Sequence, residues 1–194
     1  MEPEDSEVVS KAHLEPPAFY EKSLVNARRL LEDSKLLADH DRPQSSVILG
    51  IFAIEELGKA LIARWGVRNR ASKRDYPSHV EKQAATFALM SAVELLANVR
   101  RTEKYRKRGT FNFNKIGPHS HQFAHARAGF YDDLRMAMTY ADEEPKFPDE
   151  VRDIVCVGLA RELHGYFETA LANVEVPLAM EFAAIAYEND LGRL

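Results

Sequence analysis

Hydrophobic side chains recur along this chain at spacings of three and four residues, the period of α-helices that bury one face. The first such run begins at Pro17 and fades near His40. Its repeating positions are Tyr20, Leu24, Ala27, Leu31, Ser34 and Ala38. We find no stretch that alternates between apolar and polar residues as a half-buried strand would. The pattern therefore predicts a chain built from helices.

The second run, residues 43–68, is apolar on nearly all sides. Its three faces carry Ile48, Ile51, Phe52 and Ile62; Leu49, Ala53, Ala60 and Ala63; and Val47, Ile54 and Leu61. A helix of this kind is a central, buried one, so its charged residues Glu55, Glu56 and Lys59 should be partly buried. Buried charges must be paired. Glu55 and Lys59 stand four residues apart, a spacing that pairs well along a helix.

Four further helices are expected in the rest of the chain. Ser78 followed three residues later by Glu81 is a capping box, so a helix should begin there. Residues 104–120 predict a loop and residues 121–141 a shorter helix. A longer helix should follow Pro148, in which the neighbours of Cys156 predict a buried thiol. The last helix should follow Pro177 as an amphipathic segment, whose apolar residues are Leu178, Phe182, Ile185 and Ala186.

These elements predict an all-α fold, a helical bundle of about five to six helices. Residues 1–16 are acidic and bounded by proline, and we expect a flexible acidic N-terminal tail. Residues 17–194 should form a single helical domain.

The distribution of charge changes this picture more than the overall composition does. The chain has a net charge of −4, yet residues 64–115 hold thirteen basic and four acidic residues, a net charge of +9. This asymmetry permits a surface that faces a polyanion. The single cysteine excludes an internal disulfide. Without a secretory signal or an apolar run of the ~20 residues that span a membrane, we expect a cytoplasmic protein with no membrane contact.

Several short motifs resemble the abortive infection protein AbiV family of the HEPN superfamily. They are residues 26–34 (NARRLLEDS), 46–50 (SVILG) and 53–60 (AIEELGKA), then His79-x-x-Lys82 and Tyr131-Asp132-Asp133. The resemblance implies a HEPN-like helical bundle and phage defence by growth arrest. For HEPN proteins as a class it also implies metal-independent RNA cleavage or RNA binding, and a homodimer.

Many HEPN ribonucleases carry Arg-x4–6-His with a polar residue after the arginine, and Arg74 and His79 match this pattern with Asp75 in the polar slot. Histidine can transfer the proton of a 2′-hydroxyl and arginine can bind phosphate at two points. This motif follows the second long helix here, earlier than in most of those enzymes. A capped helix start with a surface arginine is the alternative interpretation.

Glu55, Glu56, Lys59, His79 and Lys82 could converge, because all lie on or near the buried helix and the start of the next one. They would form either a polar site for RNA or a nucleotide, or an ion network that fixes helix register. The catalytic candidates are therefore Arg74, His79, Lys82, Glu55, Glu56 and Lys59.

The loop expected at 104–120 interleaves cations with aromatic rings, an arrangement that lets bases stack while basic groups follow phosphates. Its candidate RNA-binding residues are Lys104, Tyr105, Arg106, Lys107, Arg108, Phe111, Phe113 and Lys115. The alternative is a loop whose two phenylalanines anchor it to the core or to a second subunit.

A histidine cluster follows this loop. His121 and His125 are four residues apart and could share one metal on a helix, but exposed histidines and no metal or cofactor are the stronger expectation. A second polar site across the bundle is the remaining hypothesis, with His121, His125, Arg127, Tyr131 and Asp132 as its candidates.

Two function classes follow from these features. The first is a HEPN-type ribonuclease in antiviral defence, acting on tRNA or mRNA as a homodimer. The second is a non-catalytic HEPN module that binds RNA, a nucleotide, or a phage or antitoxin protein.

Overall fold

The structure of the chain, a computed structural model, describes residues 16–66, 77–103, 118–139 and 149–191. These residues form seven α-helices and no strand. The helices are α1 (Pro16–Asp39), α2 (Pro43–Trp65), α3 (His79–Glu103), α4 (Pro118–Arg127), α5 (Phe130–Thr139), α6 (Asp149–Leu171) and α7 (Pro177–Leu191). The all-α prediction is confirmed, while the expected count of five to six helices is too low.

The extra helix arises where one helix was expected over residues 121–141. The backbone turns at Gly129, whose φ of +84° lies in the left-handed region that glycine adopts most readily. Helix α4 therefore ends just before this residue and α5 begins just after it. Helix α4 also starts at Pro118, inside the segment expected as a loop, because proline is well suited to the first turn of a helix.

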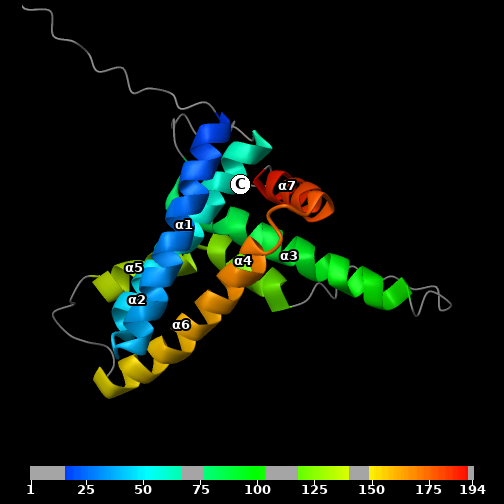
Figure 1. Cartoon of the computed structure of the whole chain (residues 1–194). Helices are drawn as coiled ribbons and strands as arrows, with labels where there is room; N and C mark the ends of the chain where they lie inside the picture. The colour runs from blue at the N-terminus through cyan, green and yellow to red at the C-terminus, as the bar shows by residue number, and fades with distance from the viewer. Residues whose placement is uncertain (1–15, 67–76, 104–117, 140–148, 192–194) are drawn as a thin grey trace, which may run out of the picture.

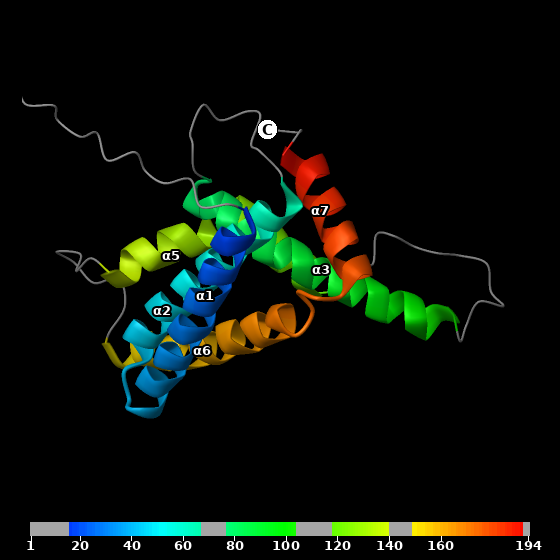
Figure 2. The ribbon, with the colours of Figure 1, turned by 45° about the horizontal axis from the view of Figure 1, so that its top comes forward.

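Helices α1 and α2 lie antiparallel and side by side, joined by residues 40–42, and α6 crosses both (Figure 1). Helix α3 packs against α2 and also contacts α4 and α7. Its C-terminal end extends beyond the other helices in both views (Figure 2). The described part of the chain contains no helix whose length and hydropathy would let it span a lipid bilayer.

Helix α2 is the central element, as its apolar faces predicted. It contacts α1, α3, α5 and α6. Its buried hydrophobic side chains are Val47, Ile51, Ala53, Ile54, Leu57, Ala60 and Leu61. Since each face of α2 meets a different neighbour, this helix sets the positions of the elements around it.

The backbones of α2 and α3 come almost into contact where the two helices cross. A β-carbon on Gly58 would collide with the carbonyl group of Lys82, so no other residue type fits there without movement. One turn away, the hydroxyl of Thr86 donates a hydrogen bond of 2.8 Å to the carbonyl oxygen of Ile54. The crossing is thus fixed by one close approach and one buried hydrogen bond.

The last two helices each leave several of their apolar side chains exposed. Cys156 is buried, as predicted, but Ile154 next to it is 73% exposed, and Val155 and Val157 are exposed too. Helix α6 packs through the face that carries Cys156, Ala160, Leu163 and Phe167. A run of apolar residues on one helix cannot all face the same neighbour, and the sequence does not say which face is covered.

Helix α7 shows the same discrepancy. Its expected apolar face, with Leu178, Phe182 and Ile185, is exposed. The side chains that it buries are Ala179, Met180, Ala183 and Tyr187. Helix α7 contacts α3, and its small alanines are buried while Phe182 is exposed.

Replacing Gly58 with alanine should destabilise the protein, because the new methyl group overlaps the Lys82 carbonyl. We expect the free energy of unfolding to fall by at least about 3 kcal/mol, the upper end of the usual cost of overpacking a core. Denaturant unfolding followed by circular dichroism measures it.

Gly158→Ala is the matched control, because this glycine of α6 is exposed and its added β-carbon would meet nothing within 4 Å. It should raise the free energy of unfolding by up to about 1 kcal/mol through helix propensity. A Gly58→Ala protein as stable as the parent would contradict the close crossing of α2 and α3.

Candidate functional site

The carboxylate of Glu55 on α2 is the centre of a buried polar cluster. Only 4% of this residue is exposed. Its Oε2 receives the ring Nδ1–H of His79 at 2.6 Å, and its Oε1 accepts a hydrogen bond from the amide nitrogen of Gln83 at 2.8 Å. The ammonium nitrogen of Lys82 lies 3.8 Å from Oε2. Three groups from the start of α3 thus compensate the burial of one charge.

The capping box predicted from the sequence positions these groups. The backbone N–H of Ser78 donates to Oε2 of Glu81 at 2.6 Å, and the N–H of Glu81 donates to the Ser78 hydroxyl at 3.2 Å. Helix α3 therefore begins at a fixed residue. Because residues three and four apart share one face of a helix, His79, Lys82 and Gln83 all face α2 at Glu55.

The hydrogen bond to Glu55 decides which ring nitrogen of His79 is available for chemistry. An ionised carboxylate only accepts hydrogen bonds, so Nδ1 carries the proton and Nε2 of the neutral ring is left with its lone pair. The His79 side chain is 47% exposed. A substrate can therefore approach the Nε2 side of a histidine ring whose Nδ1 side is held by a buried carboxylate.

The two charged residues that follow Glu55 on α2, Glu56 and Lys59, pair with each other instead of joining this cluster. Lys59 forms an ion pair with Glu56, and its ammonium lies 5.7 Å from the ring centre of Phe19. The expected pairing of Glu55 with Lys59 is therefore wrong, because Glu55 turns toward the donors of α3. Both side chains are partly buried, as their position on an apolar helix predicted.

Helix α5 adds a further acid to the cluster, which the sequence analysis did not place there. Single ligand atoms of Glu55, His79 and Asp132 all lie within 4.8 Å of one another. Asp132 also binds Arg135 at 2.6 Å, and the Arg135 guanidinium lies over the ring of Phe52. No local spacing links residues 55, 79 and 132, so only the packing of three helices could reveal this group.

The remaining residues of the expected second polar site make contacts in other directions. Tyr131 is buried, stacks on Phe87 at 4.8 Å, and donates a hydrogen bond to Gln122. Burial raises the pKa of its hydroxyl far above the usual range. The His125 ring lies 5.5 Å from that of Phe130. Tyr131 therefore acts as a core residue.

His121 and His125 are both exposed on α4, and Arg127 at its end is partly buried. Two other predicted groups lie outside the described residues. They are Arg74, and the candidate RNA-binding residues between Lys104 and Lys115. For these residues the sequence-based hypotheses stay predictions.

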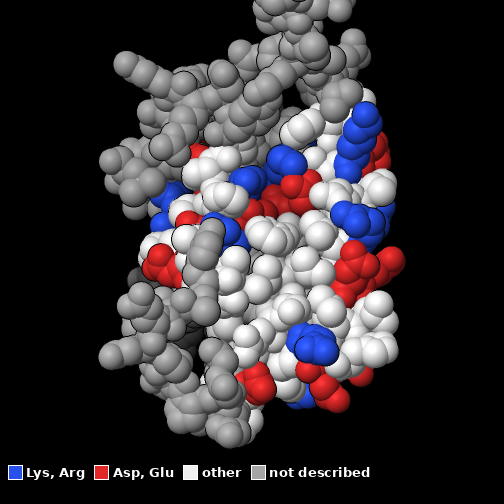
Figure 3. Space-filling view, turned by 90° about the vertical axis from the view of Figure 1, so that its left-hand side faces the viewer, with Lys and Arg blue, Asp and Glu red and all other residues white. Residues whose placement is uncertain are grey.

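The surface on the side of α1, α2 and α5 carries basic and acidic side chains next to one another, above a broad uncharged area (Figure 3). The ion pairs of Lys59 with Glu56 and of Arg135 with Asp132 come from α2 and α5. The buried cluster is thus accompanied by two partly buried ion pairs, in which charges of opposite sign neutralise each other.

Comparison with known families identifies the fold and its family. The HEPN family model described as AbiV matches residues 16–153, which is most of the chain. The chain belongs to the AbiV family. This membership puts it among abortive-infection proteins of the HEPN type and confirms the resemblance seen in the motifs around Glu55. Comparisons with the curated proteins and with the solved structures gave no match.

This AbiV-family chain has a second buried polar cluster, where α6 crosses α1 and α2. The hydroxyl of Ser34 donates to the backbone oxygen of Ser46 at 2.7 Å and lies 2.8 Å from Nε2 of His164. Because the single hydroxyl proton is already used, Nε2 carries the ring proton and donates to Ser34. The motifs of the family include both serines, but nothing in the sequence pointed to His164 as their partner.

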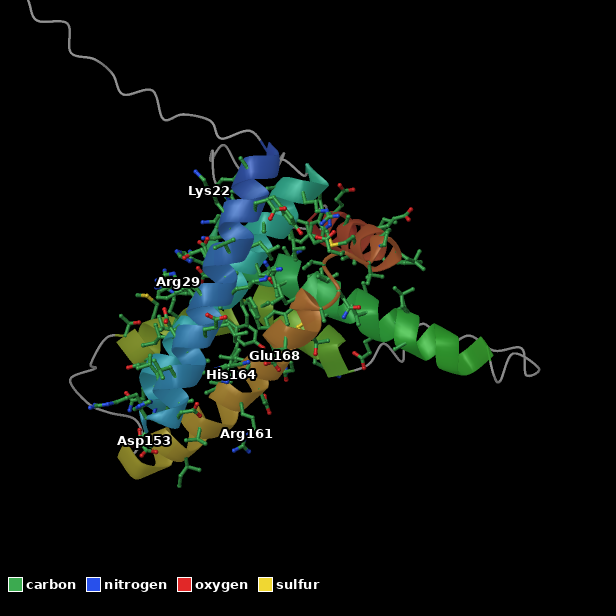
Figure 4. The ribbon with its side chains drawn as sticks, viewed as in Figure 1. Lys22, Arg29, Asp153, Arg161, His164 and Glu168 are labelled. Carbon is green, nitrogen blue, oxygen red and sulfur yellow. The ribbon has the colours of Figure 1, made fainter. Side chains whose placement is uncertain are left out.

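Figure 4 shows His164 on α6 one turn from Glu168. Burial lowers the pKa of His164, and the positive charge of Lys35 acts in the same direction, while Glu168 and Asp39 oppose it. The native cluster therefore favours the neutral imidazole. We assign it a structural role, because the Ser34 hydroxyl is buried and its proton is already engaged.

This depressed pKa makes stability depend on pH. In the unfolded chain His164 takes up a proton near its ordinary pKa of about 6.5, while the native chain does so only at lower pH. Acid therefore favours unfolding, and the contribution of His164 is lost as the pH falls below about 6.5. In His164→Gln, which can still donate to Ser34, the fall in stability between neutral pH and pH 5 should be smaller.

Urea unfolding at a series of pH values measures this difference. The exposed His121→Gln variant is the control and should follow the parent protein. Equal pH dependence in His164→Gln and in the parent would rule out a neutral, partly buried His164.

Proposed function

We propose that this AbiV-family chain is a metal-independent endoribonuclease whose proton-transfer group is His79. The observation that carries the proposal is the hydrogen bond of 2.6 Å between His79 and the buried carboxylate of Glu55. It leaves Nε2 free on a side chain that is 47% exposed. A general base must be held in one orientation and remain within reach of the substrate, and His79 meets both conditions.

The reaction requires no group beyond those of the chain and the RNA. His79 Nε2 accepts the proton of a ribose 2′-hydroxyl, whose oxygen attacks the adjacent phosphorus. The bond from phosphorus to the 5′-oxygen breaks, and the imidazolium of His79 returns the proton to that oxygen, which gives a 2′,3′-cyclic phosphate and a 5′-hydroxyl end. Glu55 acts as the positioning residue, because it holds the ring and stabilises the imidazolium that forms.

Positive charge near His79 supports the same reaction. The Lys82 ammonium lies 3.8 Å from the Glu55 carboxylate, on the helix that also carries His79. A cation placed there stabilises the charge that develops on the phosphate oxygens. Arg74, five residues before His79, would supply a further phosphate contact, and the basic aromatic segment from Lys104 to Lys115 would bind the RNA on either side.

The test is cleavage of tRNA and mRNA by the purified protein in the presence of EDTA. His79→Ala should lower the cleavage rate by about 100- to 10,000-fold, the usual contribution of a general acid or base. Glu55→Gln, which keeps the shape but lets an amide face the ring, should lower kcat more than it raises KM. Arg74→Ala should chiefly raise KM.

Folding is checked by circular dichroism, and His40→Ala provides the matched control, because this histidine is exposed at the end of α1. It should cleave as the parent does. Cleavage that survives His79→Ala, or RNA binding with no cleavage by the parent, would contradict the proposed reaction. Product ends other than a cyclic phosphate would contradict the role of the 2′-hydroxyl.

A further inference from the structure

We propose that Glu55, His79 and Asp132 form a binding site for one divalent transition-metal cation of the zinc type. The three residues come from three helices, and one potential ligand atom of each lies within 4.8 Å of the other two. One imidazole and two carboxylates suit such ions, and two negative charges offset the charge of the cation. This inference goes beyond the proposed ribonuclease, which needs no metal.

The distances are close to those of a loaded site. A zinc ion lies about 2 Å from each of its ligand atoms, so atoms that share it lie within about 4 Å of one another. Asp132 must therefore approach by less than about 1 Å, while Nδ1 of His79 and Oε2 of Glu55, now 2.6 Å apart, must separate slightly. His79 and Asp132 are both partly exposed, and their side chains can move that far while the buried Glu55 stays in place.

The partner of Glu55 in the core supports its use as a ligand. Gln83 is fully buried and its amide nitrogen donates to Oε1 of Glu55. This contact leaves Oε2, the atom that faces His79, for the cation. Hydrogen bonds that orient a ligand from behind are typical of metal sites. The amide oxygen of Gln83 has no hydrogen-bond partner among the described residues.

Two cationic side chains now lie where a metal would compete with them. Lys82 lies 3.8 Å from Oε2 of Glu55, and Arg135 binds Asp132 at 2.6 Å. Both must give up part of these contacts when the metal binds. Removal of the Lys82 charge should therefore strengthen metal binding, a direction that a purely structural ion network would not predict.

Metal binding and proton transfer exclude each other at His79. A cation on Nδ1 replaces the proton that Glu55 now accepts, and the neutral ring then carries its proton on Nε2. That ring has no lone pair left to act as a base. The cation would therefore inhibit a ribonuclease that works through Nε2.

Calorimetric titration of the apo protein with Zn²⁺ tests the site without RNA, so its failure leaves the proposed ribonuclease untouched. We expect one Zn²⁺ per chain. Asp132→Asn and His79→Gln should each bind at least about 10-fold more weakly, since loss of even an outer partner of a ligand costs that much. Lys82→Met should bind more tightly. Co²⁺ should give the same stoichiometry and a visible spectrum that reports its ligands.

His121→Gln is the matched control, because His121 and His125 stand four residues apart on α4 and could hold a metal themselves. It should bind Zn²⁺ as the parent does. No stoichiometric binding, binding unaffected by both Asp132→Asn and His79→Gln, or binding abolished by His121→Gln would each overturn the proposal. Circular dichroism establishes that each variant is folded.

Discussion

The contact between the backbones of α2 and α3 at Gly58 is the constraint on which the rest of the site depends. Because Gly58 has no side chain, the carbonyl group of Lys82 can lie against α2. A larger residue would push the helices apart and move His79, Lys82 and Gln83 away from Glu55. The short motif at residues 55–59, within the range that matches the AbiV family, therefore has two roles. Its glycine lets the two helices come close together, and its first glutamate accepts hydrogen bonds from His79 and Gln83.

The burial of a charge explains why this cluster is so fully hydrogen-bonded. Glu55 belongs to a helix that is apolar on nearly every face, and an unpaired carboxylate there would cost several kcal/mol. One imidazole and one amide donate hydrogen bonds to it, and one ammonium lies near it. The same arrangement fixes the ring of His79, so a requirement of folding also creates an oriented histidine at the surface. Asp132 lies close to both Glu55 and His79, which is the basis of the proposed cation site.

The sequence predicted those features that depend on local patterns. The capping box predicted where α3 starts and therefore where His79 lies. The apolar faces of α2 predicted that this helix is central. The sequence did not predict the features that depend on packing. Gly129 divides one expected helix into two, and α7 buries alanines while Phe182 stays exposed. The meeting of Asp132 with Glu55 likewise follows from the placement of three helices, which no spacing along the chain encodes.

The site depends on the hydrogen bond by which Glu55 holds the Nδ1–H of His79. The most direct measurement is a long-range ¹H–¹⁵N correlation spectrum of the histidine rings, recorded at a pH where His79 is neutral. We expect a protonated Nδ1 and an unprotonated Nε2 for His79 in the parent protein, with this preference lost in Glu55→Gln and the His121 signals unchanged. A neutral His79 with its proton on Nε2 in the parent, or identical His79 signals in the two proteins, would contradict it.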